Sequence, residues 1–260
     1  MLGLLRRHPF GMEAHLKRVL ALTYARPVAE LAPLLPRGLE LDTFNGHGFV
    51  AVAMVEAGQM RPSGWPKFTG LNFFLAGYRL FVRLRTRDGR NLRGLYILRS
   101  STDRRSMVWG GNALTRYGYR RCGIEMEERE ERLRVNVVSP GGEADLRLAA
   151  ALRPDADLSP TGSPPPGLFF PDEKTARRFA GPLPYTFSMD PDGKSAWVIE
   201  GERETWNPRL VSVKVECNSF RLSENTPRLD SESPASAFYV ADVAYRWKRG
   251  VRVLLPIEES

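Results

Sequence analysis

Nearly continuous apolar runs broken by short polar stretches dominate the first third of the chain, a pattern typical of buried strands. Residues 18–25 are almost entirely apolar until Arg26 interrupts them, which predicts a buried strand. Pro27 suits the first position of a helix, apolar residues recur after it at helical spacing, and Pro36 and Gly38 follow. We therefore expect a short helix between Pro27 and Gly38.

Two β-hairpins are predicted next. Residues 39–44 and 49–55 flank the dipeptide Asn45-Gly46, whose residues tolerate the positive φ angles of a two-residue type I′ turn. Residues 78–84 alternate between apolar and polar positions, and a glycine-containing turn separates them from the apolar run 94–98. Each pair is expected to form neighbouring antiparallel strands.

Helical signals are few. Asp103 is placed to cap a helix over Ser106–Tyr117, although two glycines inside it each disfavour the helix by about 1 kcal/mol. A proline-rich loop at Pro160–Gly167 precedes a short helix that Asp172 can cap and Gly181 can end. Both helices are expected at the periphery.

Five further strands complete the pattern. They cover Leu133–Val138, Ala196–Ile199, Leu210–Cys217, Phe238–Trp247 and Val251–Leu255. Because strands outnumber helices and hairpins connect them, the sequence predicts an α+β, mainly β fold: an antiparallel β-barrel-like sheet with a few peripheral helices. No repeat or shift in composition divides the chain, so we expect a single domain over residues 1–260.

The charge of the protein is carried mainly by arginine. Of the 38 basic residues only six are lysines, so 32 are arginines, and the formal net charge is +8. Arginine binds carboxylate and phosphate groups through two parallel hydrogen bonds. The 30 acidic residues are interleaved with the basic ones, and no nucleic-acid-binding motif accompanies the charge. We therefore do not expect nucleic acid as the partner.

Several classes of protein are excluded or not expected. The longest apolar stretch, 71–82, is too short to span a bilayer, and the N-terminus lacks the apolar segment of a secretory signal. We place the protein in the cytoplasm. The three histidines lack metal-binding spacing, and Cys122 and Cys217 form no CxxC pair. No metal or cofactor is expected.

Three arginines share one face of a predicted strand. Arg79, Arg83 and Arg85 alternate with apolar residues, and like charges so close together repel unless water or an anion compensates them. Solvation on an outer face is the simpler interpretation. The alternative is a polar pocket in which Arg79 or Arg83 binds a carboxylate or phosphate.

A second candidate site lies on the strand Leu210–Cys217. Ser212, Lys214 and Glu216 share its polar face. If that face pointed into a barrel, burial would lower the pKa of Lys214 and make it an amine nucleophile, with Glu216 as an acid–base partner. The simpler interpretation is that both side chains face water.

The chain also resembles a known family. The similarity is carried by Leu31–Gly46, Tyr78–Arg83, Gly94–Leu98, Ala113–Tyr119, Trp206–Pro208 and Val243–Pro256. These segments look like the YqjF-like family of uncharacterised bacterial proteins, which belongs to the acetoacetate decarboxylase-like superfamily. The resemblance implies one barrel-like domain whose interior forms a small-molecule pocket.

The same resemblance argues against the decarboxylase reaction. In the decarboxylase a buried lysine forms a Schiff base with a β-keto acid, and a neighbouring cation lowers its pKa. The matching position here is approximately Thr115-Arg116, and the family's strand glutamate falls near Leu75 or Ala76. Arginine stays protonated and cannot replace the lysine.

These observations define the expected site. We predict a pocket lined by Arg79, Arg83, Tyr96, Arg116 and Tyr119 that binds a small anionic or carbonyl-bearing molecule. Whether the pocket is catalytic stays open, as does a homo-oligomeric state. The alternative functions are a lyase or isomerase acting through Lys214, or electrostatic association with nucleic acid.

Overall fold

The computed structural model describes residues 7–152, 169–179, 183–224, 226, 228–231 and 233–256, and most of these lie in strands. The larger sheet contains β1 (Met12–Pro27), β2 (Leu39–Leu41), β3 (His47–Pro62), β4 (Leu71–Arg85), β5 (Asn91–Thr102), β6 (Tyr119–Arg121), β10 (Tyr185–Met189), β11 (Ser195–Arg203), β12 (Arg209–Leu210), β14 (Ser236–Trp247) and β15 (Val251–Leu254). The smaller sheet contains β7 (Gly123–Arg129), β8 (Arg132–Val138), β9 (Leu146–Ala151) and β13 (Ser212–Asn218). The helices are α1 (Val28–Leu31), α2 (Arg105–Leu114) and α3 (Glu173–Arg177), with 3₁₀ turns at Ala32–Leu34, Lys67–Thr69 and Leu229–Ser231.

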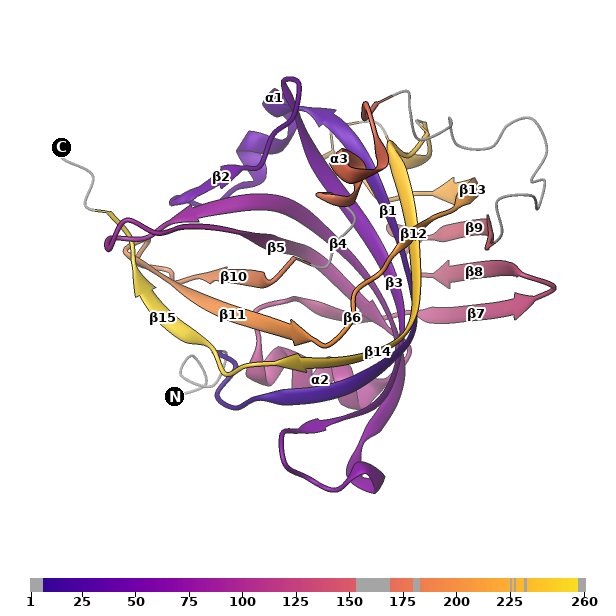
Figure 1. The fold of residues 1–260 in the computed structure, drawn as a ribbon, viewed down its shortest axis with the longest axis horizontal. Helices are drawn as coiled ribbons and strands as arrows, with labels where there is room; N and C mark the ends of the chain where they lie inside the picture. Colours follow the sequence, from indigo (N-terminus) through magenta and orange to yellow (C-terminus); the bar gives the residue numbers. More distant parts are fainter. Residues whose placement is uncertain are drawn as a thin grey trace.

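The larger sheet curls into a ring-like arrangement. Its strands follow the order β14-β1-β3-β4-β5-β10-β11, and β11 pairs with β14 again (Figure 1). Two of these pairings are short: β5 meets β10 in parallel only along Tyr185–Phe187, and β11 meets β14 only along Gly201–Arg203. The predicted mainly β, barrel-like sheet with few helices is confirmed, whereas a closed barrel is not formed.

The long strands are buried on both faces. On β1, Leu20 and Leu22 face the smaller sheet and pack with it. Val19 and Ala21 point the other way, toward the inside of the curled sheet, which is called the hollow side below. The smaller sheet lies beside β1, β3 and β4 in Figure 1. Burial on both faces explains why the sequence of these strands is nearly continuously apolar instead of alternating.

One end of the hollow side is filled by aromatic side chains. Phe49 of β3 and Phe81 of β4 pack against Phe170 and Phe179, which flank α3. The predicted cap of α3 is confirmed, because a carboxylate oxygen of Asp172 accepts a hydrogen bond of 2.6 Å from the Thr175 amide. The predicted loop at 160–167 and the helix stop at Gly181 lie outside the described residues.

The first predicted hairpin is wrong in its pairing. Asn45 and Gly46 do have positive φ angles of 49° and 74°, and Phe44 bridges His47, so the turn forms as expected. However, β2 pairs with β4 along Leu39–Leu41, because one edge of β3 is occupied by β1 and the other by β4 up to Leu80. The part of β4 beyond Leu80 is free to accept β2. The second hairpin, β4 with β5, is confirmed.

Other boundaries also differ from the expectation. The helix after Pro27 is a single turn followed by a 3₁₀ turn. Asp103 does not cap α2; its carboxylate accepts a hydrogen bond from the Phe74 amide, so it links α2 to β4 instead. The predicted strand over residues 210–217 is split between β12 and β13, which belong to different sheets. No described helix has the length and apolar character that a membrane span requires.

A buried carboxylate holds the β2–β4 corner. Asp42 is fully buried, and its two oxygens accept hydrogen bonds from the Nε atoms of Arg83, at 2.8 Å, and of Arg93. Two residues away from Asp42 and Arg83 along the same two strand segments, Glu40 and Arg85 form an exposed pair at 3.4 Å. The two pairs have the same chemistry but differ in burial.

We predict that Asp42→Asn lowers the free energy of unfolding by about 2 kcal/mol, because it removes two charge-assisted hydrogen bonds from a dry site. Glu40→Gln is the matched control and should change it by less than about 0.5 kcal/mol, since an exposed pair contributes little. Urea unfolding measures both. Equal effects of the two substitutions would show that Asp42 does not hold this corner.

Candidate functional site

A cavity of about 270 Å³ lies on the hollow side of the ring. Small residues make the room for it: in register, Ala21 of β1 lies opposite Ala53 of β3, Ala53 lies opposite Gly77 of β4, and Gly77 lies opposite Ser100 of β5. All four line the cavity. A row of the smallest side chains across four neighbouring strands therefore leaves a hollow where larger ones would fill the interior.

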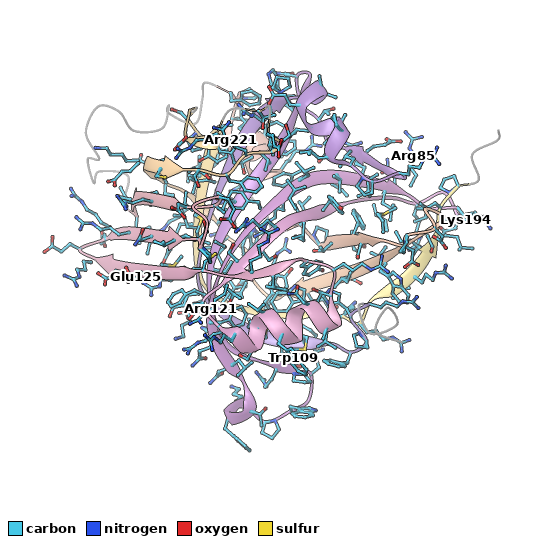
Figure 2. The ribbon with its side chains drawn as sticks, turned by 180° about the vertical axis from the view of Figure 1, so that it is seen from behind. Arg85, Trp109, Arg121, Glu125, Lys194 and Arg221 are labelled. Atoms are coloured by element: carbon cyan, nitrogen blue, oxygen red, sulfur yellow. The ribbon has the colours of Figure 1, made fainter. Side chains whose placement is uncertain are left out.

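Helix α2 covers this hollow. Met107, Gly111 and Leu114 lie on one side of the helix and line the cavity. Their spacing of three and four residues puts them on the same helix face. Trp109 lies on the other side of α2, where its side chain is 80% exposed (Figure 2). The cavity is thus enclosed between the curled sheet and a helix that is apolar toward it.

Arg79 of β4 is the only charged side chain among the described residues that line the cavity. No described carboxylate lies within ion-pair distance of it, and its Nε atom is buried without a hydrogen-bond partner. Burial lowers the pKa of the Arg79 guanidinium from 12.5 to about 10, so it is still charged at neutral pH. A charge held in this way is costly unless a ligand compensates it.

Three tyrosines surround the guanidinium. Tyr117, Tyr119 and Tyr245 all line the cavity and interact electrostatically with Arg79. Burial raises the pKa of each phenol, that of Tyr119 to about 12, so all three are neutral hydroxyl groups at physiological pH. Neutral hydroxyls can donate hydrogen bonds to an anion but cannot neutralise Arg79.

The end of α2 positions two of these tyrosines. The hydroxyl of Thr115 donates to the Gly111 carbonyl and accepts from the Tyr117 amide, which ends the helix. Asn112 then fixes Tyr119 through both backbone groups, donating to its carbonyl at 2.9 Å and accepting from its amide at 2.8 Å. These bonds hold the tyrosine backbone against the cavity wall.

The N-terminal segment contributes a histidine. The His8 amide donates to the Leu114 carbonyl and its carbonyl accepts from the Gly250 amide, which ties the segment across the end of α2. The ring lies 5.0 Å from that of Tyr117, centre to centre, and lines the cavity. Burial lowers the pKa of His8 to about 4, so the imidazole is neutral. Its Nε2 atom has no hydrogen-bond partner among the described residues.

A second pocket, of about 370 Å³, shares a wall with the cavity. Tyr117 and Ile97 line both spaces, and Tyr96 and Arg116 line only the second one. Arg116 differs from Arg79 in having partners: it donates to the Met189 carbonyl and to Asp190, whose carboxylate also accepts from Ser195, Trp197 and Arg252. Its charge is therefore compensated within the protein.

The structure brings together only some of the predicted residues. Arg79 and Tyr119 lie in the cavity, Tyr96 and Arg116 lie in the neighbouring pocket, and Arg83 lines neither because it pairs with Asp42. The predicted row of arginines thus runs from the interior at Arg79 to solvent at Arg85, which is labelled at the edge of the sheet in Figure 2. The solvated interpretation holds for Arg85 and not for Arg79.

Sequence reasoning missed His8, Tyr117 and Tyr245. Tyr117 and Tyr245 lie within segments that carry the family resemblance, which is the one available signal for them. The alternative based on Lys214 fails on position, since Lys214 and Glu216 are exposed on β13 of the smaller sheet. This alternative required both side chains to point into a barrel, and that condition is not met.

The positions that the resemblance assigns to imine chemistry lie at the cavity wall. Thr115 and Leu75, at the positions where the resemblance placed the lysine and the glutamate, both line the cavity. Among the described lining residues there is no lysine, aspartate or glutamate. No cluster of described His, Cys, Asp or Glu side chains could hold a metal ion.

Residues 13–244 match the family DUF2071, described as "Uncharacterized conserved protein (COG2071)". The chain belongs to this family. The expected membership in an uncharacterised family with the acetoacetate decarboxylase-like fold is therefore confirmed by the family match and by the fold comparisons that follow. A comparison with curated proteins gave no match.

Solved structures show the fold of this DUF2071 chain. The acetoacetate decarboxylase from Legionella pneumophila is similar with a TM-score of 0.61 and 12% identity, over 94% of this chain and 86% of the decarboxylase. A second acetoacetate decarboxylase gives 0.56 and 10%, over 96% and 91%. The enduracididine biosynthesis enzyme MppR, complexed with pyruvate, gives 0.51 and 11%, over 94% and 88%.

We predict that this DUF2071 chain forms no imine with a β-keto acid. After incubation with acetoacetate and borohydride its intact mass should be unchanged, because none of the described residues that line the cavity carries an amine. Thr115→Lys is the matched gain of function. It puts an amine in the cavity that Arg79 also lines, where burial and a nearby positive charge lower the lysine pKa, and it should give an adduct. A wild-type adduct on any lysine would contradict the prediction.

Adjacent glycines of α2 provide a test of the cavity wall. A methyl group at Gly111 would overlap the Tyr119 ring, whereas one at Gly110 would meet no atom within 4 Å. Gly110→Ala should raise the free energy of unfolding by about 0.5–1 kcal/mol through helix propensity. Gly111→Ala should lower it by about 1–3 kcal/mol because the ring must move. Thermal unfolding of both variants measures this, and stabilisation by Gly111→Ala would refute the packing of Tyr119.

Proposed function

We propose that this protein binds a small molecule with a carboxylate or other anionic or carbonyl group in the cavity around Arg79. The observation that carries the proposal is a guanidinium that has a buried Nε atom and lines a cavity without a described acidic partner. Elsewhere in the chain, arginines with buried surroundings have carboxylates: Arg83 and Arg93 share Asp42, and Arg99 pairs with Glu143 at 2.7 Å. Arg79 is different, and an anionic ligand would compensate it.

The surroundings of Arg79 favour an anion over a cation. A methyl group built on Gly77 would lie 3.9 Å from a terminal nitrogen of Arg79, so the absence of a side chain there leaves space beside the guanidinium. The tyrosine hydroxyls around it are neutral donors. A carboxylate in this space would gain two hydrogen bonds from the guanidinium and further ones from the phenols.

The fold neighbours support the same class of ligand. Acetoacetate decarboxylase is named for a small keto acid, and MppR has been obtained as a complex with pyruvate. Both molecules combine a carboxylate with a carbonyl group. Since no lysine is found among the described residues that line the cavity, the proposal is recognition of such a group and not covalent attachment to it.

We predict that Arg79→Met weakens the binding of butyrate and pyruvate by about 2 kcal/mol or more, which is roughly thirtyfold in dissociation constant. Arg85→Met, on the same strand but exposed, is the matched control and should leave binding unchanged. Isothermal titration calorimetry measures the affinities. Equal affinities of the wild type and Arg79→Met would refute the proposal.

The same pair of variants separates a binding role from a structural one. If Arg79 is kept for a ligand, Arg79→Met removes a charge that has no acidic partner among the described residues, and it should raise the free energy of unfolding of the empty protein by roughly 1–3 kcal/mol. A loss of stability would indicate a structural role instead. In addition, affinity should be constant between about pH 7 and 9, because Arg79 keeps its charge over this range even with its lowered pKa.

A further inference from the structure

The residues that line the cavity change in character along the strands, and the charged residue lies at one end. Every second residue of β4 lines the cavity, in the order Arg79, Gly77, Leu75, Phe73 and Leu71. Arg79 is thus followed by apolar positions only. At roughly 3.3 Å per residue, the distance from Arg79 to Leu71 along the strand is about 26 Å.

The neighbouring strand repeats this order. In register with β4, the β3 residues opposite Gly77, Leu75, Phe73 and Leu71 are Ala53, Val55, Ala57 and Met60, and all of them line the cavity. On β1, Val19, Leu16 and Met12 continue the apolar lining in the same direction. Three adjacent strands therefore form an apolar trough that leads away from the guanidinium.

The far end of the trough reaches the surface. Leu71 is 44% exposed and Phe10, which also lines the cavity, is 41% exposed. These residues lie where β4 begins and just before β1 begins, the end of the sheet from which the β3–β4 loop projects in Figure 1. The trough thus runs from a buried cation to a half-exposed apolar mouth.

Charge and size restrict what fits. The described lining offers one cation, so a second negative charge on the ligand would have no partner in the apolar part. The volume of about 270 Å³ is well above the ~150 Å³ of an engineered apolar cavity that holds benzene. A two- or three-carbon acid would leave most of the apolar surface uncovered.

We propose that the ligand is an elongated apolar monocarboxylic acid, whose carboxylate pairs with Arg79 and whose hydrocarbon part lies along β3 and β4 toward Leu71. This inference rests on the proposed function and specifies it: the recognised group is a single carboxylate, and the length of the apolar part determines affinity. The short keto acids named for the fold neighbours have no such apolar part.

The test is a series of straight-chain acids titrated into the full-length protein by calorimetry: acetate, butyrate, hexanoate and octanoate. Affinity should rise by about fourfold for each methylene that becomes buried, hence roughly fifteenfold from hexanoate to octanoate. Two matched ligands complete the series. Octan-1-ol has the chain without the carboxylate, and octanedioate carries a second carboxylate at the tail; both should bind at least tenfold more weakly than octanoate.

A blocking variant checks the direction of the trough. Leu75 lies midway between Arg79 and Leu71 and is only partly buried, so Leu75→Phe should fill the trough at that point. Butyrate should still bind, while the gain from butyrate to octanoate should be lost. Leu98→Phe is the control, because Leu98 of the adjacent β5 is also partly buried but packs on the opposite face of the sheet.

The outcomes separate the two proposals. If short and long acids bind equally well and Arg79→Met weakens both, the carboxylate site is real and the apolar trough is refuted. If no acid in the series binds, or if Arg79→Met leaves octanoate binding unchanged, the proposed function itself fails. A chain-length dependence that Leu75→Phe leaves intact would place the hydrocarbon part elsewhere and overturn the inference. The series on the wild type needs no variant to fold.

Discussion

The arrangement of this protein depends on one guanidinium that has no described acidic partner. Arg79 is held in an apolar cavity, where a charge is costly, and the surrounding phenols leave it uncompensated. Other arginines in buried or partly buried positions, such as Arg83, Arg99 and Arg116, are paired with Asp42, Glu143 and Asp190, whereas no described carboxylate lies beside Arg79. A fold that maintains such a charge sacrifices stability at that position, which is typical of a site built for a ligand.

The cavity exists because the two faces of the larger sheet are packed differently. Its outer face is filled by interlocking side chains from the smaller sheet, and a buried hydrogen-bond chain from Tyr78 through Asn218 to Tyr24 joins the two layers. Its inner face carries a row of alanine, glycine and serine across four strands, so the curled sheet cannot fill its own interior. Helix α2 and the His8 segment then cover the hollow. Firm packing on one side supports an unfilled space on the other.

Sequence patterns predicted the strands much better than their partners. The alternation at residues 78–84 and the apolar runs of β1 and β3 indicate which positions are buried. The turn at Asn45-Gly46 also forms, with the positive φ angles that these residue types tolerate. The partner of β2 could not be predicted, because it depends on which edge of β3 is already occupied by β1 and β4. The residues predicted for the site are brought together only in part. Arg79 and Tyr119 line the cavity, whereas Arg83 lies on the same strand face as Arg79 but pairs with Asp42.

By itself the sequence determined the mainly β class and the positions of most strands, since these depend on residue type and local spacing. The tertiary structure decided which arginine is solvated, which is paired, and which lines a cavity with no acidic partner among the described residues. Those outcomes depend on carboxylates that are distant in sequence, such as Asp42, and on the register that aligns Ala21, Ala53 and Gly77. Alternation along one strand shows which residues share a face, but what that face meets is determined by the strands and helices that pack against it.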